Sequence, residues 1–367
     1  MSFRWLFQLM ISLMLVLLAT QPAELQAQQL VSRTSSTGNS AAKWQTYTIE
    51  GVEYVKLNDL FKFYRFVQLK KTMRAGYITY GAQNRFVSLK AGHMDFYMNN
   101  FRYILSYPIR TMGSALMVST TDVKKLIDPV LRPRFDRSSG KVTTVVLDPG
   151  HGGHDAGAVS SYAREKDCNL QLAERVRNLL VKKGLKVVMT RDRDYFLTLQ
   201  QRVNIANKYP NSIFVSIHHN SARSSASGIE TFTLAPKGTT SPFARAKVSK
   251  SLSGNNQDSE NIALATAVHS RAIKASGAVD RGIQRARFSV LCTIQRPAIL
   301  FEGGFVSNPK EGKLISSPAY QDKLAKAICE GILSYCAIVG GHQGLKQRTS
   351  SGSSSSRPYY SGTRYAQ

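Results

Sequence analysis

Four side chains in the sequence have the types and positions needed for catalysis. His151 lies in the Gly-rich stretch "LDPGHGGHDAGA", Glu165 in "AREKDCNL" and Glu302 in "ILFEGGFVSN". The fourth is a histidine of "FVSIHHN", which runs from Phe214 to Asn220. Two histidines and one carboxylate form a typical catalytic zinc shell whose fourth position is open to water. A second carboxylate that does not bind the metal can take a proton from that water.

Each feature also has an ordinary explanation. A Gly-rich turn after a strand is often a phosphate cradle or a plain turn, although "DPGHGG" lacks the lysine of a P-loop. Glu165 near a helix start could simply complement the helix dipole. Glu302 is harder to dismiss, because burying an unpaired carboxylate after "PAILF" would cost on the order of several kcal/mol. A metal site at the strand end would supply a partner.

The adjacent histidines His218 and His219 cannot easily serve one site. Neighbouring residues of a strand point to opposite faces of the sheet. We therefore expect one histidine to be a ligand and the other to pack or to line the groove.

From Lys141 onward, strand patterns alternate with amphipathic helix patterns. Strands are predicted in "VTTVVLD", "LKVVMTR", "SIFVSIH", "GIETFTLA", "FSVLC" and "PAILFEGG". Helices are predicted in "NLQLAERVRNLLVKKG", "LQQRVNIANK", "ENIALATAVHSRAIKAS" and "AYQDKLAKAICEGILSYC". The fold class is α/β, with a largely parallel sheet flanked by helices on both faces. Ligands of such sheets bind beyond the carboxyl ends of the strands, where the polar clusters fall.

The rest of the chain divides by composition. Short aromatic-rich runs with Gly and Asn-Asn turns predict a small α+β module, closed by a helix that begins near Thr120 or Thr121. The predicted divisions are a signal peptide (1–27), a linker (28–43), the small module (44–135), the catalytic domain (141–340) and a disordered basic Ser/Gly-rich tail (341–367).

The N-terminus predicts export. Arg4 precedes an apolar run from Trp5 to Ala19, and Ala27 suits the last position before cleavage. The alternative is an uncleaved membrane anchor. Cleavage would leave no stable membrane span, and the protein would work in the periplasm, the cell envelope or the extracellular space.

The net charge of +26 favours a polyanionic neighbour. Export excludes nucleic acid, so we expect the basic surface and tail to bind anionic envelope polymers.

The four cysteines have no metal-type spacing, and two of them, Cys329 and Cys336, lie about 10 Å apart along one predicted helix, too far for a disulfide. All four, including Cys168 and Cys292, are predicted to be buried small hydrophobes.

Six motifs in order resemble the zinc-dependent N-acetylmuramoyl-L-alanine amidases of the cell-separation type. They are "VVLDPGHGGHDAGA", "REKDCNLQLAERVRNLLVKKGLKVVMTRDRD", "RVNIAN", "FVSIHHNSA", "GIETF" and "ILFEGGFVSNPKE", within Val145 to Ile338. The resemblance implies that His151, Glu165 and His218 bind one Zn²⁺ and that Glu302 is the catalytic base. The implied reaction is hydrolysis of the amide between N-acetylmuramic acid and L-alanine in peptidoglycan, for wall remodelling or daughter-cell separation.

The small module resembles the copper amine oxidase N-terminal-like stalk domain in its "GVEYVKLNDL" start. That resemblance implies a binding or spacer role and no copper. Two alternatives to the amidase activity remain: another zinc peptidase acting on wall peptides, and a non-catalytic wall-binding protein.

Other polar residues have more than one interpretation. Asp148 could orient His151 or stabilise the turn, and Asn220 could support a ligand or cap its strand. Arg191 and Arg202 are predicted to be structural or on the groove rim. No role is predicted for His154, and the remaining histidines are predicted to lie at the surface: His93 (or structural), His269 and His342.

Some relatives of this kind carry a helical insertion that plugs the zinc site. The segment Pro236–Asn261 is Ser/Gly/Lys-rich, has no strong amphipathic period and offers no good glutamate to the metal. The sequence therefore predicts an open site without such autoinhibition.

Overall fold

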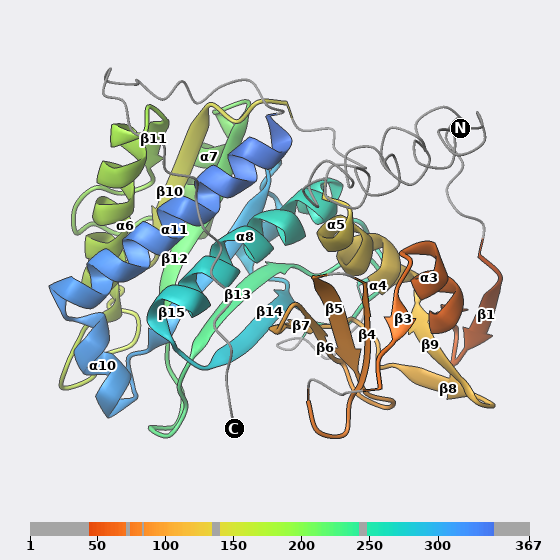
Figure 1. Cartoon of the computed structure of the whole chain (residues 1–367). Helices are drawn as coiled ribbons and strands as arrows, with labels where there is room; N and C mark the ends of the chain where they lie inside the picture. The colour runs from red at the N-terminus through yellow and green to blue at the C-terminus, as the bar shows by residue number, and fades with distance from the viewer. Residues whose placement is uncertain (1–43, 71–73, 83, 134–139, 242–247, 341–367) are drawn as a thin grey trace, which may run out of the picture. The chain divides into compact units, whose positions relative to one another are not determined.

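The computed structural model describes residues 44–70, 74–82, 84–133, 140–241 and 248–340 (Figure 1). The predicted signal peptide, linker and basic tail lie outside these residues. From Thr46 on, the described residues belong to one compact unit. Among the described residues, no helix has the combined length and apolar character that crossing a bilayer requires.

The first part of the unit is built from short strands and helices, as the small α+β module was predicted to be. Its first sheet has the antiparallel order β1-β2-β9-β8. The closing helix begins at Thr120, where the Ser119 side chain accepts a hydrogen bond from the Asp122 N–H. The elements are β1 (Thr46–Ile49), β2 (Val52–Lys56), α3 (Leu57–Phe63), β3 (Val67–Gln68), β4 (Ile78–Ala82), β5 (Arg85–Leu89), β6 (Asp95–Met98), β7 (Phe101–Ile104), β8 (Arg110–Met112), β9 (Ala115–Ser119), α4 (Thr120–Asp122), the π-helical turn η1 (Val123–Ile127) and α5 (Asp128–Leu131).

The second part alternates strands with longer helices. It contains β10 (Thr144–Pro149), α6 (Glu165–Lys182), β11 (Lys186–Met189), α7 (Leu199–Asn207), β12 (Ser212–Asn220), β13 (Ile229–Leu234), the 3₁₀ turn η2 (Ser253–Gln257), α8 (Asp258–Ser276), β14 (Asp280–Ala286), α9 (Ser289–Cys292), β15 (Ala298–Phe305), α10 (Pro309–Ile315) and α11 (Pro318–Val339).

The strand predicted in "FSVLC" is wrong, because Ser289–Cys292 forms the single helical turn α9. The N–H groups of Leu291 and Cys292 both donate to the Phe288 carbonyl and close that turn. So short an apolar run fits a buried helical turn as well as a strand, and tertiary packing decides between them. The strand lies just before it, as β14, which the sequence patterns did not single out.

The main sheet is mixed, so the prediction of a largely parallel sheet is wrong. Its strand order is β11-β10-β12-β15-β13-β14-β7-β6-β5-β4-β3. The pairs from β11 to β15, and those of β14 with β13 and β7, are parallel. Strand β13 is antiparallel to β15, and every pair from β7 to β3 is antiparallel. The physical reason is that locally connected hairpins extend the sheet beyond β14 and that β13 enters it reversed.

Helices cover both faces of the catalytic part of the sheet, as predicted. On one face, α7 and α9 pack on a core that includes Val146, Phe214 and Leu300. On the other, α11 lies against α6 and α8, which contact the sheet (Figure 1). This packing fixes where each strand ends and so where the polar side chains meet.

The N-terminal part is joined to the catalytic sheet by buried polar contacts as well as by strand pairing. β7 pairs with β14 at Tyr103 and Ile283. The buried Arg285 guanidinium lies 3.4 Å from the Asp122 carboxylate and donates to the Ser106 hydroxyl at 2.8 Å and to the Lys125 carbonyl. The predicted domain boundaries stay predictions, but the two parts share one continuous sheet.

Candidate metal and catalytic site

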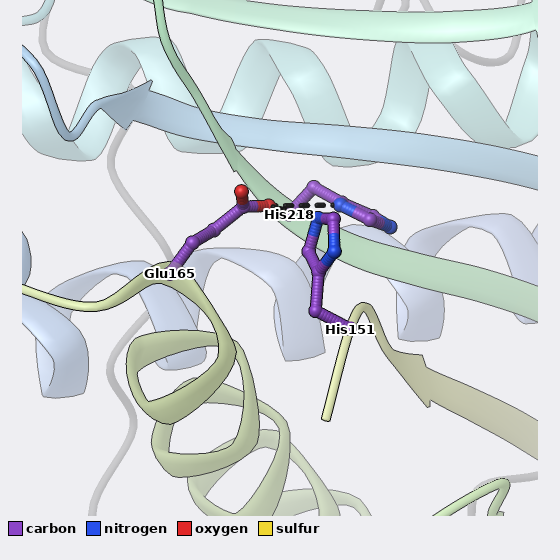
Figure 2. A group of neighbouring side chains, drawn as sticks. All are labelled: His151, Glu165 and His218. Atoms are coloured by element: carbon purple, nitrogen blue, oxygen red, sulfur yellow. Dashed lines mark hydrogen bonds and ion pairs between the residues drawn. The ribbon is translucent and has the colours of Figure 1, made fainter. Parts of the chain in front are cut away.

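Three of the predicted residues come together at the carboxyl ends of the strands. His151 follows β10, Glu165 is the first residue of α6 and His218 is in β12. One ligand atom from each lies within 4.8 Å of the other two. Glu165 Oε1 is 3.1 Å from His151 Nε2 and 2.9 Å from His218 Nδ1, and Figure 2 shows both imidazoles turned toward this carboxylate. The imidazole planes are inclined at 78°.

Glu165 is buried and firmly held. Its Oε2 accepts a hydrogen bond from the Ala158 N–H at 2.9 Å, and its Oε1 accepts one from the Asn169 amide at 3.2 Å. Burial by itself would raise the pKa of Glu165, but the hydrogen bonds from His151 and His218 outweigh it and hold that pKa well below its usual range. The group is therefore an ionised carboxylate, which is the form that binds a metal.

His151 is oriented by Asp155, a residue that the sequence analysis did not single out. Asp155 Oδ2 lies 2.8 Å from His151 Nδ1, while Asp155 Oδ1 accepts from the Gly157 N–H at 3.1 Å. This leaves Nε2 of the imidazole for the ligand cluster. A carboxylate on the second ring nitrogen is the usual companion of a metal-binding histidine. The available signal was the carboxylate four residues after the histidine in "GHGGHDAG".

The predicted orienting role of Asp148 is not supported, because Asp155 holds the His151 ring instead. The Asp148 carboxylate accepts hydrogen bonds from Thr190 at 2.6 Å, Arg202 at 2.8 Å and Ser216 at 2.8 Å, all of them buried. Arg202 in turn donates to the His151 carbonyl at 2.8 Å. Asp148 thus supports the backbone of the turn.

Arg191 and Arg202 are structural, which confirms one of the two readings offered for them. Arg191 donates to the Gly150 carbonyl at 2.9 Å and to the Lys166 carbonyl at 2.7 Å. Both arginines are buried and bind the loop that carries His151.

Two glycines leave the room that the ligand side chains occupy. A Cβ on Gly150 would lie 2.1 Å from His218 Cε1. A Cβ on Gly157, whose φ is +63°, would lie 2.5 Å from Glu165 Oε2 and 2.6 Å from His151 Cδ2. Such distances are impossible without displacing the ligands, so the turn is shaped around this cluster.

The two adjacent histidines differ as strand alternation predicted. His219 is buried at 1% exposure, and its Nδ1 lies 2.8 Å from Asn169 Oδ1 on α6. Burial lowers the pKa of His219 to about 4, so its ring is neutral at physiological pH. His219 packs beneath the site, whereas His218 faces Glu165.

Glu302 lies beside the cluster. It is the register partner of His218 on one side and of Glu230 on the other. Its Oε2 is buried and, among the described residues, has no hydrogen-bond partner. Burial raises the pKa of Glu302 well above its usual range, and the nearby carboxylates of Glu165 and Glu230 raise it further. A carboxyl group with a raised pKa suits the acceptance of a proton.

Asn220 is tied to Glu230 and not to the ligand cluster. Its side-chain amide donates to Glu230 Oε2 at 3.2 Å, and its carbonyl accepts from the Ser221 N–H. Its suggested support of a ligand is therefore not seen, and Asn220 instead holds a carboxylate that is the register partner of Glu302.

The remaining predictions on histidines and cysteines have mixed outcomes. His269 is fully buried between Thr231 at 3.0 Å and Asp280 at 2.9 Å, so its surface assignment is wrong. The reason is that α8 is enclosed between the sheet and α11.

His93 and His154 are exposed, and His342 lies outside the described residues. All four thiols are free, with Cys168 and Cys329 buried and Cys292 and Cys336 only partly so.

The described part of the segment Pro236–Asn261 lies at the far end of the sheet from Glu302. It follows the carboxyl end of β13, and β13 is antiparallel to β15. Asn255 donates to the Ala235 carbonyl, and Arg287 donates to the Thr239 carbonyl, which fastens the segment there. Because residues 242–247 are outside the described ranges, the open site stays a prediction.

An α/β sheet with a partly exposed His/Glu/His cluster and a buried carboxyl oxygen at its strand ends defines a candidate metallohydrolase. The family model of the N-acetylmuramoyl-L-alanine amidases matches residues 145–334, and the chain belongs to that family. The family and the enzyme class predicted from the sequence are confirmed.

Two relatives from Escherichia coli, AmiA and AmiC, agree with this assignment. The chain is 31% identical to the N-acetylmuramoyl-L-alanine amidase AmiA of Escherichia coli (strain K12) over 254 residues, which cover 61% of this chain and 86% of AmiA. It is 34% identical to AmiC of Escherichia coli O6:H1 over 244 residues, which cover 59% of this chain and 58% of AmiC. The chain therefore spans little more than half of AmiC. The catalytic domain of CwlV, an amidase from Bacillus (Paenibacillus) polymyxa var. colistinus, is 35% identical, with a TM-score of 0.45, over 53% of this chain and 99% of CwlV.

Proposed function

We propose that His151, Glu165 and His218 hold one Zn²⁺ and that Glu302 is the proton-transferring residue in hydrolysis of the N-acetylmuramoyl-L-alanine amide of peptidoglycan. The observation that carries this proposal is the pairing of His218 with Glu302. It sets a buried carboxyl oxygen with no described partner beside three converging metal donors.

The donor set fits zinc. Two imidazoles and one carboxylate are the protein ligands of a common type of catalytic zinc site, and such a set leaves one coordination position for water or substrate. When bound, the ion supplies Lewis-acid polarisation of the scissile carbonyl and lowers the pKa of a water molecule. Gly150 and Gly157 have no Cβ, and this leaves the space in which the ligand side chains can approach one another closely.

The protein's own groups move the proton. Glu302 takes it from the attacking water as the new C–O bond forms on the lactyl carbonyl. It then delivers the proton to the L-alanine nitrogen as the C–N bond breaks, because an amine leaves poorly without protonation. The products are a muramic acid carboxylate and a stem peptide with a free L-alanine amine. Asp155 keeps the His151 ring in one tautomer and orientation throughout.

Export to the periplasm, the cell envelope or the extracellular space belongs to the same proposal. Peptidoglycan stems carry free carboxylates, and the net charge of +26 would raise the rate of encounter with them and with other anionic envelope polymers.

The test uses purified peptidoglycan sacculi and the full chain. Wild type should release stem peptides with a free N-terminal L-alanine, a chelator should stop the release, and added Zn²⁺ should restore it. Glu302→Gln should keep its zinc but lose roughly 10²- to 10⁴-fold in rate, the usual contribution of a positioned proton-transfer group.

Other results would favour the alternatives. Cleavage inside the stem would identify a peptidase, binding without release would identify a wall-binding protein, and an unchanged rate in Glu302→Gln would remove Glu302 from the mechanism.

A further inference from the structure

A bulge in β14 redirects the side chain of Arg281. Ile229 of β13 is opposite Asp280 and Glu230 is opposite Gly282, so Arg281 is an extra residue with no partner across the pair. Gly282, at φ +96°, allows the chain to return to the sheet. Bulges of this kind concentrate next to active sites because they aim one side chain out of the regular alternation.

The bulge is fixed by contacts from two other elements. The Arg102 backbone N–H of β7 donates to Asp280 Oδ2 at 2.9 Å, and its guanidinium donates to the Arg281 carbonyl at 3.3 Å. The buried His269 of α8 lies 2.9 Å from the other Asp280 oxygen. The N-terminal part of the unit therefore helps to place Arg281.

The Arg281 guanidinium is anchored on one side only. Its Nε donates to the Glu230 carboxylate, and its centre lies 4.9 Å from the Phe305 ring centroid. The Glu230 side chain is only 5% exposed, whereas that of Arg281 is 37% exposed. Among the described residues, no hydrogen bond is found to the two terminal nitrogens of Arg281. These two nitrogens are therefore available to a ligand. The contact of Nε with Glu230 already fixes the orientation of the guanidinium.

Arg281 also lies on a line that begins at the metal donors. The neighbouring strands β12, β15, β13 and β14 carry His218, Glu302, Glu230 and Arg281 in that order. Strands are about 4.8 Å apart, so β14 lies roughly 10 Å from β15, and the Arg281 side chain reaches back over β13 to Glu230. A peptide advances about 3.5 Å per residue, so a group roughly two residues from the scissile amide falls within this reach.

We propose that Arg281 binds a free carboxylate of the stem peptide close to the scissile amide and so makes the enzyme prefer acidic over amidated stems. The inference rests on the proposed function. A guanidinium that is already anchored through Nε can present its two terminal N–H groups to a carboxylate as a charge-assisted pair. A surface hollow of about 520 Å³ beside the bulge, lined in part by Val279 and Lys310, offers room for the rest of the stem.

The experiment compares two substrates that differ in a single group. N-acetylmuramoyl-L-alanyl-D-glutamate and its isoglutamine counterpart, in which the α-carboxylate is an amide, are given to the zinc-loaded full chain. In both compounds the γ-carboxyl is blocked as an amide, as it is in an intact stem, so they differ only in the α-carboxylate. The measured quantity is the ratio of kcat/KM for the acid to kcat/KM for the amide. Wild type should favour the acid by about 10- to 100-fold, the usual value of a hydrogen-bonded charge, and Arg281→Gln should bring the ratio close to one.

Two further variants keep the test decisive. Arg281→Gln leaves Glu230 buried without its cation, so the double variant Glu230→Gln/Arg281→Gln removes both charges in case the single variant does not fold. Its ratio should also be close to one. Lys186→Gln makes the same change in charge at the amino end of β11, away from the site, and should keep the wild-type ratio.

The outcomes separate the two proposals. A wild type that cleaves both compounds equally, or a folded Arg281 variant that keeps the preference, overturns the role of Arg281 while the amidase assignment stands. A wild type that releases the L-alanine amine from neither these compounds nor sacculi overturns the proposed function, and the Arg281 inference with it.

Discussion

His218 and Glu302 are register partners on the parallel strands β12 and β15. Paired residues in a sheet direct their side chains to the same face, so the proposed metal donor and the proposed proton-transferring group leave the sheet side by side. His219, one position later, turns to α6 and contacts Asn169. The pairing therefore separates the functional histidine from its neighbour.

Single alanine substitutions at the two histidines should have unequal effects on zinc. His218→Ala removes a donor, and the purified protein should lose its zinc and its activity. His219→Ala should keep close to one zinc per chain, although the lost packing and hydrogen bond should lower its free energy of unfolding by about 1–3 kcal/mol. Metal analysis after dialysis measures both. Zinc loss from His219→Ala, with zinc retained by His218→Ala, would reverse the assignment.

Asp155→Ala should weaken zinc binding without removing a ligand. The carboxylate contacts His151 Nδ1 at 2.8 Å, and loss of such a partner usually costs 10- to 100-fold in metal affinity. Competition with a chelator of known affinity measures the change. Asp194→Ala is the matched control, because Asp194 binds the Gly153 N–H and Lys166 in the same region but touches no donor. Equal losses in both variants would contradict an orienting role for Asp155.

Gly157→Ala should disturb the proposed metal site as well as strain the backbone at residue 157. Gly157 and Gly184 both have positive φ, +63° and +83°, and an alanine there costs roughly 1–2 kcal/mol at either position. A Cβ at Gly184 would meet nothing within 4 Å, whereas one at Gly157 would collide with Glu165 and His151. Zinc content should therefore fall in Gly157→Ala alone. A normal zinc content in both variants would show that the loop around Gly157 can shift to make room for the added Cβ.

The residues of the proposed metal site could be picked out from the sequence because each lies in a short motif whose local chemistry is unusual. A histidine between glycines, or a glutamate that ends an apolar strand, is visible without knowledge of the fold. Asp155 was overlooked although it stands four residues after His151, because its contact with that ring depends on the left-handed backbone of His151, with φ +62°, and on the turn that follows.

Long-range pairing was equally hidden. The sequence places β13 directly after β12, but the sheet inserts it beyond β15 in the opposite direction. Local periodicity carries no information on that choice, nor on the bulge that aims Arg281. The same limit explains His269, which was predicted to lie at the surface and which α11 and the sheet enclose.

Asp122→Ala should destabilise the whole unit, because it leaves the Arg285 guanidinium buried without its carboxylate. Asp122 also accepts hydrogen bonds from the Ser106 and Tyr107 N–H groups. Removing one partner of a buried pair typically costs 3–5 kcal/mol. Glu330→Gln, in a pair with Arg271 whose side chains are more than 40% exposed, should cost less than about 1 kcal/mol. Urea unfolding measures both, and similar small losses would show that the N-terminal part is only loosely attached.

Asp148→Asn should change the acid dependence of stability. Burial opposes ionisation of Asp148, but the Arg202 charge and the hydrogen bonds from Thr190 and Ser216 hold its pKa below the usual value. A carboxyl whose pKa is lower in the folded state stabilises the protein above its unfolded pKa of about 3.9, and this contribution is lost as the pH falls through the folded pKa. The variant should therefore be less stable than wild type by about 3 kcal/mol at pH 7, and the gap should narrow below about pH 4. Urea unfolding at pH 7, 5 and 3 measures this difference in the free energy of unfolding. Zinc-free proteins are used, because protonation of the metal ligands then affects wild type and the variant alike. A gap that widens in acid would mean that Asp148 is protonated in the folded protein.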